Sequence, residues 1–286
     1  MFNEKGLILI LEDVDANMAK NNIPIRHRLP RALLEVSKKL NLSISLYPNF
    51  LSNGYVDEHS KFIHEWYNNR YGDRLKYSGR LGSFYVLLKH DFWFFDVPVF
   101  FGECAFYLCQ DLSDIGGGSS CNILATCKEM TQSFADLLTD AEIKSIQDVF
   151  ILAVSFHISL ESIKCRGLIM GDAAFADLNA ANGHIISQVE HYGQAKWSYS
   201  QFIEKILKSL IHLKGVNNVR RFNHSLLELT REFNKVYSAN VPLELVEEIK
   251  ASANVRYDEG KVKKEEIFRI QSCVFHFINE VSASLK

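Results

Sequence analysis

One stretch near the middle of the chain, KWSYSQFIEKILKSLIHLKG over residues 196–215, constrains the fold more than any other. At about 100° per residue, its apolar side chains gather on one side of a helical wheel and its polar side chains on the other. The apolar set is Ala195, Tyr199, Phe202, Ile203, Ile206, Leu210 and Leu213, and the polar set is Gln201, Glu204, Lys205 and Lys208. Gly215 is a typical helix end. The stretch therefore predicts an amphipathic helix that packs one face into a core.

The composition is that of an ordinary globular protein, with 47% hydrophobic and 23% charged residues. A chain of 286 residues is long enough for two domains. Its 32 basic and 34 acidic residues leave no overall basic surface, so that only a local patch could bind nucleic acid. The early apolar run LILIL is too short to span a membrane and predicts a buried strand or a short helix. We expect a cytoplasmic protein without membrane association.

The six cysteines contain no C-x-x-C pair, and no pair of histidines completes a zinc site. They are best explained as buried free thiols in a reducing compartment. The sequence therefore predicts no metal site and no cofactor.

The first half of the chain mixes helical and strand patterns. Apolar spacing predicts helices over residues 28–40 and 61–71, the second ended by Gly72. The charged residues at that end, Arg70, Asp73 and Arg74, are expected to form structural salt bridges. Residues 82–110 are dense in β-branched and aromatic residues, which predicts two or three antiparallel strands covered on both faces.

The segment after these strands has a glycine triplet, Gly116 to Gly118, whose backbone N–H groups could cradle a phosphate. Neither the G-x-x-x-x-G-K nor the G-x-G-x-x-G frame is present, so a flexible connector is favoured. Residues 121–138 resemble a helix. Thr139 and Glu142 form a capping box for the next helix, which places His157 in its apolar face as a core histidine.

From residue 172 onward the pattern is helical, with Asn223 as an N-cap candidate and short connections that predict an antiparallel bundle of four or five helices. Two glycines within residues 165–171 mark the candidate domain boundary. The predicted fold class is α+β. Residues 1–168 would form a domain with helices around a small antiparallel sheet, and residues 169–286 a helical bundle.

Three motifs in the second half carry a family resemblance. They are Gln201, Glu204, Lys205 and Lys208 in a Q-x-x-E-K-x-x-K helix, then His224, Leu226 and Leu229, then Arg256 and Tyr257 before the last helix. In this order they resemble the HEPN family, the higher eukaryote and prokaryote nucleotide-binding helical bundles, over about residues 172–286. The family comprises metal-independent ribonucleases, which act as dimers, and non-catalytic modules that bind nucleotides or nucleic acid.

The resemblance implies a bundle that binds nucleotide or RNA, within a toxin–antitoxin or phage-defence system. It also implies a homodimer through the C-terminal bundle and a partner such as an antitoxin, a nucleotidyltransferase or an ATPase. The candidate binding residues are Lys205, Lys208, Arg220, Arg221 and His224. The last three begin a helix, where an anion is stabilised. The alternative interpretation of this set is a solvated basic face.

The family's ribonucleases carry an Arg followed, after four to six residues, by a His. Only Arg269 and His276 fit this frame, and they lie within about 20° of each other on the wheel. Histidine could act as general base or acid and arginine could stabilise phosphorane charge, so an endoribonuclease is the alternative function. Ordinary ion pairs with Glu265 and Glu280 would also explain both residues. A third interpretation is a structural or dimerisation module without chemistry.

Overall fold

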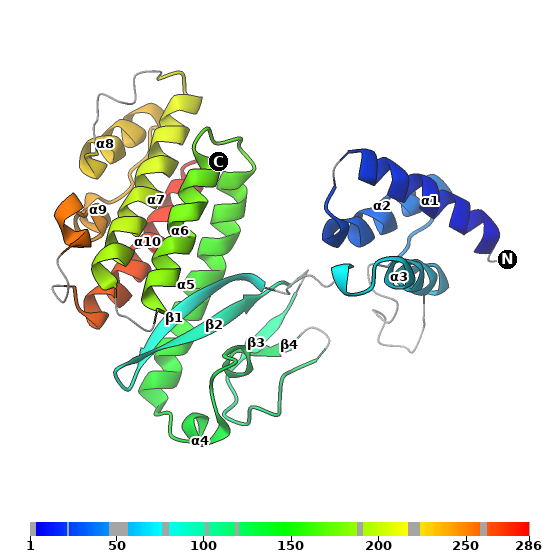
Figure 1. Ribbon diagram of the computed structural model, residues 1–286, viewed down its shortest axis with the longest axis horizontal. Helices are drawn as coiled ribbons and strands as arrows, with labels where there is room; N and C mark the ends of the chain where they lie inside the picture. The colour runs from blue at the N-terminus through cyan, green and yellow to red at the C-terminus, as the bar shows by residue number, and fades with distance from the viewer. Residues whose placement is uncertain are drawn as a thin grey trace. The chain divides into compact units, whose positions relative to one another are not determined.

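The computed structural model describes residues 4–21, 23–45, 57–75, 80–100, 103–117, 120–187, 191–216, 224–257 and 262–285 (Figure 1). The chain divides into two compact units, Met1–Gly79 and Arg80–Lys286. The boundary predicted between residues 168 and 169 thus lies inside the second unit. The physical reason is that strand β1 (Arg80–Leu88) packs against helices from both sides of that position, α5 (Asp140–Lys164) and α10 (Lys264–Ala283).

The first unit consists of three helices, α1 (Glu4–Lys20), α2 (Arg28–Leu40) and α3 (Glu58–Tyr71), with 3-10 turns at Ile25–His27 and Gly72–Leu75. The helices predicted over residues 28–40 and 61–71 are confirmed, and Gly72 is the C-cap of α3 at φ 49°. The early apolar run is part of a 17-residue helix, not a strand or a short helix. The buried residues of this helix recur at helical spacing, both within the apolar run LILIL and among the polar residues that follow it. They are Leu7, Leu11, Val14 and Met18.

A buried carboxylate, that of Asp15, links the three helices of this unit. Its side chain is only 3% exposed and lies 3.4 Å from Arg28 Nη1 and 3.5 Å from Arg70 Nε. The Tyr71 hydroxyl donates a hydrogen bond to it. The predicted salt bridge of Arg70 is therefore confirmed with a partner from α1, while Arg74 lies over the Tyr71 ring. The side chain of Asp73 lies outside the described part of the chain.

The second unit begins with an antiparallel hairpin of β1 and β2 (Asp91–Pro98), in which Tyr85 pairs with Phe94. This confirms a small antiparallel sheet of two strands. A third strand, β3 (Ala105–Tyr107), pairs instead in parallel with β4 (Ser120–Asn122).

The helix predicted over residues 121–138 is wrong. The structure has β4, a 3-10 turn at Leu124–Thr126 and the four-residue helix α4 (Gln132–Ala135) in its place. The cause is Asn122, which is fully buried and hydrogen-bonds the backbone of Cys109 and Asp114 through its side chain. These long-range bonds hold the backbone extended at a position where the local pattern favours a helix.

The glycine segment is a tight connection between β3 and β4. Gly116 has φ +78°, and a Cβ atom there would lie 2.5 Å from the Ser120 carbonyl oxygen. Its N–H donates to Asp114 Oδ1, and that of Gly117 donates to Ser120 Oγ. Both N–H groups are thus satisfied within the segment, whereas Gly118 lies outside the described residues.

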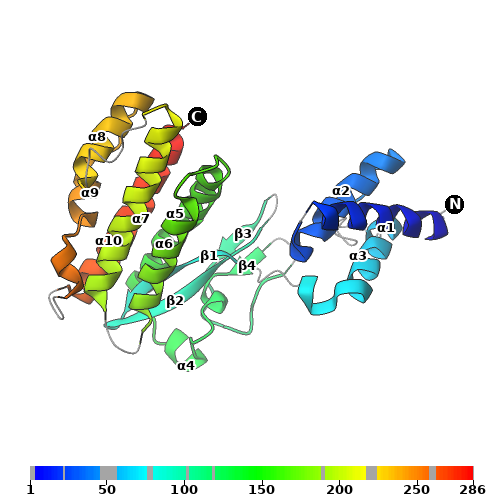
Figure 2. The same ribbon diagram turned by 45° about the horizontal axis from the view of Figure 1, so that its top comes forward.

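The rest of the second unit is helical, which confirms the prediction of a C-terminal helical region. After α5 follow α6 (Gly171–Ile185), α7 (Tyr192–Leu213), α8 (Leu226–Tyr237), α9 (Leu243–Ile249) and α10. Helix α7 packs against α6, α8 and α10, and the views in Figures 1 and 2 agree that it runs between α6 and α8. The Thr139–Glu142 capping box at the start of α5 is confirmed.

Two polar side chains bind the hairpin to the helices. Gln271 of α10 pairs with both backbone groups of Tyr85 at 3.0 Å, as a neighbouring strand would. His157 of α5 is buried, as predicted, with Nε2 3.0 Å from the backbone N and O of Ser83. Burial lowers the pKa of His157 below its ordinary value of 6.5.

By length and composition, α5 is the one helix of the described ranges that could cross a membrane. Of the most apolar 18-residue stretch of this helix, 44% is buried within the protein, mainly against β1 and α10. All six cysteines are free thiols, but only Cys127 is buried and Cys165 is exposed, so that the expectation of buried thiols holds for Cys127 alone.

Candidate functional site

The predicted polar face of α7 does not face solvent. Glu204 is only 4% exposed, and Gln201, Lys205 and Lys208 are half-buried. The reason is the central position of α7, which places the predicted polar side against α6 and the start of α8. The helix is therefore covered nearly all round, and its polar residues contact one another and neighbouring helices.

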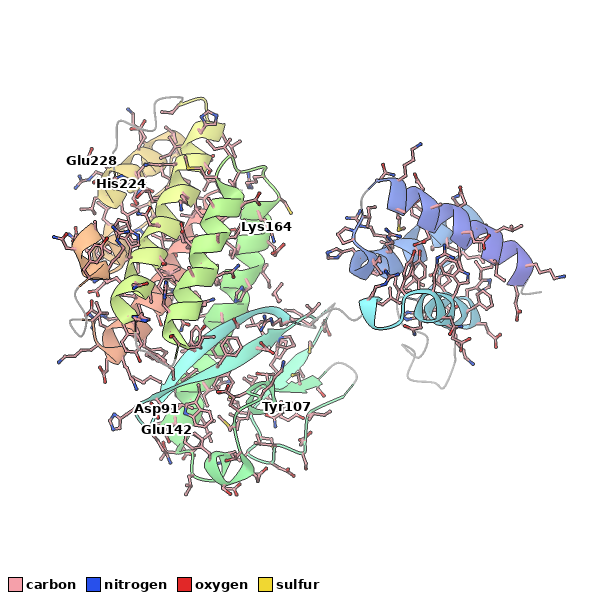
Figure 3. All side chains as sticks on the ribbon, in the orientation of Figure 1. Asp91, Tyr107, Glu142, Lys164, His224 and Glu228 are labelled. Atoms are coloured by element: carbon pink, nitrogen blue, oxygen red, sulfur yellow. The ribbon has the colours of Figure 1, made fainter. Side chains whose placement is uncertain are left out.

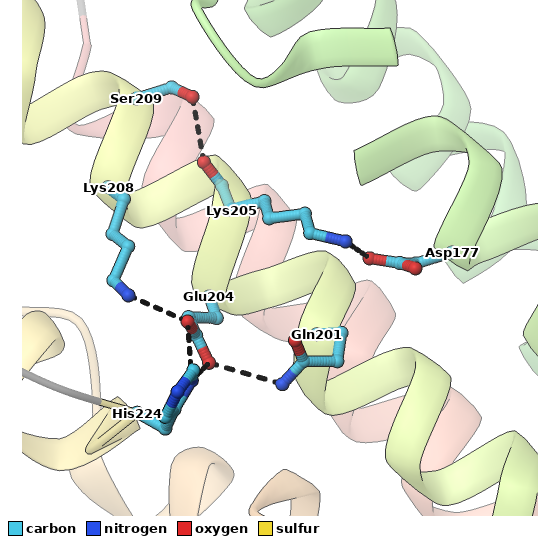
Figure 4. Close-up of polar contacts among 7 residues, drawn as sticks. All are labelled: Asp177, Gln201, Glu204, Lys205, Lys208, Ser209 and His224. Atoms are coloured by element: carbon cyan, nitrogen blue, oxygen red, sulfur yellow. Dashed lines mark hydrogen bonds and ion pairs between the residues drawn. The ribbon is translucent and has the colours of Figure 1, made fainter. Parts of the chain in front are cut away.

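Glu204 is the centre of this site (Figure 4). Its Oε1 lies 2.7 Å from Lys208 Nζ and 3.0 Å from His224 Nδ1. Its Oε2 lies 3.2 Å from Gln201 Nε2 and 3.1 Å from His224 Nδ1. We call Gln201, Glu204, Lys208 and His224 the Glu204 cluster. The structure thus brings together four residues that the sequence placed in two separate motifs.

Burial makes the Glu204–Lys208 pair energetically demanding. The two side chains are 6% and 11% exposed, so neither charge is fully hydrated. Two unit charges removed from water destabilise a fold unless each is paired and hydrogen-bonded. Glu204 meets this requirement with donors on both oxygens, at the contact between α7 and the start of α8.

His224, labelled in Figure 3, differs from the other members of the cluster. Its side chain is 75% exposed. A carboxylate only accepts hydrogen bonds, so Nδ1 must carry the hydrogen that Glu204 accepts. The other ring nitrogen, Nε2, is then free of that contact and available to a ligand. A buried carboxylate that orients an exposed imidazole is suited to binding an anion or to transferring a proton.

Lys205 belongs to a different ion pair. Its Nζ contacts the carboxylate of Asp177 on α6, and both side chains are about a quarter exposed, at 26% and 23%. Asp177 could not be identified from sequence, because no local pattern specifies which helix packs against α7. Lys205 therefore points away from the Glu204 cluster and stabilises the α6–α7 contact.

The remaining candidates of the binding set, Arg220 and Arg221, lie outside the described residues, as does the predicted N-cap Asn223. The N-cap of α8 is Ser225, whose hydroxyl accepts from the Glu228 N–H at 3.3 Å. His224 is consequently the residue directly before the cap.

The two candidate catalytic residues are both exposed on α10 but have different neighbours. Arg269 Nε lies 3.0 Å from Glu248 Oε2 of α9, a partner that replaces the expected Glu265. His276 borders an open groove between α5 and α10, and no ion pair between His276 and Glu280 is present among the described residues. Seven residues of helix separate the two side chains by about 10 Å along the axis.

No group of three or more His, Cys, Asp or Glu side chains suited to a metal ion is present in the residues that the structure describes. The polar groups at the Glu204 cluster are one carboxylate, one ammonium, one amide and one imidazole. This set can bind an anion through nitrogen donors.

Comparison of the chain with protein-family models, curated proteins and solved structures found no match.

Proposed function

We propose that the helical part of the second unit binds a nucleotide or RNA through a phosphate group at the Glu204 cluster. The observation that carries the proposal is the contact of 3.0 Å between His224 Nδ1 and the buried Glu204 carboxylate. This contact fixes the imidazole while leaving its other nitrogen toward solvent. A phosphate oxygen would accept a hydrogen bond from that nitrogen when the ring is protonated.

Two further features favour an anion at this position. The positive end of the α8 dipole begins two residues after His224, at Leu226. In the sequence, Arg220 and Arg221 come shortly before His224, and their part in the site is a hypothesis from sequence. Lys208 contributes positive charge at the base of the cluster, although Glu204 neutralises it in the unbound protein. The proposed site is therefore small and specific to phosphate rather than an extended basic surface.

The test is a titration of the full-length protein with a fluorescein-labelled 12-nucleotide RNA and, separately, with ATP. We expect His224→Ala to weaken binding about tenfold, as for the loss of a charge-assisted hydrogen bond. His90→Ala is the matched control, because this histidine is also exposed but lies in the turn between β1 and β2. The double variant Arg220→Glu/Arg221→Glu tests the hypothesis that these two arginines take part in the site. If neither ligand binds at millimolar concentration, the proposal is wrong and a structural module is favoured.

The second candidate function is a metal-independent ribonuclease that uses Arg269 and His276, as in a toxin or defence effector. The exposure of both side chains on α10 favours it, while the ion pair of Arg269 with Glu248 counts against a free guanidinium. The chemistry would be attack of a 2′-hydroxyl on phosphorus, with His276 accepting its proton; the bond from phosphorus to the 5′-oxygen breaks, which leaves a 2′,3′-cyclic phosphate, and the departing 5′-oxygen takes a proton from water. RNA degradation in the presence of a chelator tests the activity. Equal degradation by the His276→Ala variant would rule out this assignment while leaving the activity itself intact.

The expected cellular context, a cytoplasmic toxin–antitoxin or defence system with a partner protein, is part of the same proposal. The identity of the ligand would distinguish two cellular roles. A bound mononucleotide favours a nucleotide-sensing module, and bound RNA favours an effector.

A further inference from the structure

The donors beside the Glu204 cluster lie within a very short piece of the chain. The exposed imidazole of His224 comes two residues before α8, and its Nε2 is not used by Glu204. Among the residues that the structure describes, the N–H groups of Leu226 and Leu227 in the first turn of α8 have no acceptor, whereas the Glu228 N–H donates to Ser225 Oγ. First-turn N–H groups have no partner within their own helix. One side chain and two backbone groups of residues 224–227 are thus available to a single phosphate group.

The charges at this point suit a ligand with more than one negative charge. Glu204 and Lys208 neutralise each other, which leaves the imidazole and the start of α8. A helix start carries about half a positive charge, and a bound anion favours the protonated imidazole, so that the sum is about one and a half. A terminal phosphate carries about 1.5 to 2 negative charges at pH 7, whereas a phosphodiester within a strand carries about one. The balance of charge therefore favours a terminal phosphate.

The surroundings of the cluster do not favour a row of phosphates. Glu228 lies in the first turn of α8 with its side chain 60% exposed, and its contact with Arg231, at 3.7 Å, is exposed as well. A strand that continued from His224 along α8 would bring its next phosphate toward this carboxylate. Lys205, the other lysine of the α7 motif, is already paired with Asp177. An RNA strand is therefore bound better by its end than by its interior.

We infer that the Glu204 cluster recognises a terminal phosphate, that is, a phosphate monoester at the end of an RNA strand or on a mononucleotide, and discriminates against the phosphodiesters within a strand. This inference rests on the proposed function and names the class of phosphate that the site takes. A monoester has three unesterified oxygens for His224 Nε2 and the N–H groups of Leu226 and Leu227, while a diester has two. Glu204 is a positioning residue, because it orients the imidazole through Nδ1.

The first experiment compares two RNAs that differ only at one end. The full-length protein is titrated with a 12-nucleotide RNA labelled at its 3′ end, once with a 5′-phosphate and once with a 5′-hydroxyl. We expect the phosphorylated RNA to bind at least about tenfold more tightly, since it adds charge-assisted hydrogen bonds. The preference should fall below about threefold in His224→Ala and should persist in His90→Ala. Equal affinities in the wild type, or a tenfold preference that survives in His224→Ala, would overturn the inference.

The second experiment removes the strand and keeps the chemistry. Adenosine 5′-monophosphate and adenosine 3′,5′-cyclic monophosphate share their base and ribose, but the first is a monoester and the second a diester. We expect the monoester to displace the phosphorylated RNA at about a tenfold lower concentration than the diester. Displacement at concentrations similar to that of the RNA itself identifies a mononucleotide as the source of the phosphate, and displacement only at much higher concentrations identifies the RNA end. Equal potency of the two nucleotides would contradict a preference for monoesters.

Failure of the inference and failure of the proposed function have different results. If neither RNA nor either nucleotide binds at millimolar concentration, the proposed function itself is wrong. If both RNAs bind equally and His224→Ala weakens both, the proposed function stands and only the preference for a terminal phosphate is overturned.

Discussion

Each unit of the protein contains a buried carboxylate surrounded by nitrogen and hydroxyl donors, but the two clusters are arranged differently. Asp15 receives donors from α2 and α3, so that its contacts join all three helices of the first unit. Glu204 receives two of its donors from its own helix and the third from His224, which is 75% exposed. The first arrangement is closed and structural. The second leaves one member open to solvent, which is what a binding site requires.

The largest effect is expected from Asp15→Asn. This change leaves Arg28, whose side chain is only 11% exposed, without a counter-charge. We expect a loss of about 3–5 kcal/mol from the free energy of unfolding of the first unit. Urea-dependent hydrogen exchange on peptides from α1 to α3 measures it. Asp13→Asn is the control, because Asp13 is 69% exposed and should cost less than about 1 kcal/mol.

Glu204→Gln should cost less, about 2–3 kcal/mol, because His224 can turn to water and only the buried Lys208 ammonium loses its contact of 2.7 Å with a carboxylate. Hydrogen exchange on α7 and α8 measures this loss. Glu228→Gln, at a side chain that is 60% exposed, is the control. A cost as large as that of Asp15→Asn would mean that the Glu204 cluster is also closed and structural, and the contrast between the two clusters would fail.

Acidification should affect the two units in different pH ranges. His157 has a pKa lowered by burial, so the unfolded chain binds its proton first and the second unit loses stability as pH falls below 6.5. The slope from this group is at most about 1.4 kcal/mol per pH unit. His184, whose pKa is lowered by burial and by His191, acts in the same direction.

The first unit should respond to acid at lower pH. Burial opposes ionisation of Asp57, but backbone hydrogen bonds from Ser45 and Ser60 lower its pKa below 3.8, so its contribution is lost as pH falls below that value. Unfolding by urea at pH 7, 5 and 3.5 separates the two responses. His157→Gln should flatten the profile of the second unit between pH 6.5 and 5, and His90→Gln, at an exposed position, should not.

The smallest effect concerns the ion pair between Asp177 and Lys205, of which only Lys205 was predicted from sequence to bind a ligand. A double-mutant cycle between Lys205→Met and Asp177→Asn should give a coupling of about 0.5–1 kcal/mol, since both side chains are partly hydrated. Ligand binding by Lys205→Met should equal that of the wild type. Weaker binding would place Lys205 back in the site and would extend it toward α6.

Local sequence patterns were sufficient to predict most of the helices. The spacing of apolar residues identified α2, α3 and α7, and the Thr139–Glu142 capping box marked the start of α5. These signals act over three or four residues, so no distant contact is needed to recognise them. The failure at residues 121–138 has the opposite cause, because Asn122 bonds to backbone groups up to 13 residues away.

The candidate site could be predicted only in part. The residues Gln201, Glu204, Lys208 and His224 were identifiable from their motifs, but their meeting point was not, since it depends on where α8 begins relative to α7. The helical wheel placed the polar residues of α7 toward solvent, because a wheel represents one helix without the helices that pack around it. Packing against α6 and α8 then converted them into a buried ion pair and an oriented imidazole.

The sequence by itself determined the α+β class, the positions of the main helices and the set of charged residues available for chemistry. The tertiary structure alone decided that the compact units divide at residue 79, that Glu204 is buried, and that Lys205 pairs with Asp177. The physical reason is the range of the interactions. Helix formation follows from neighbours within one or two turns, whereas burial and charge pairing depend on which distant segments pack together.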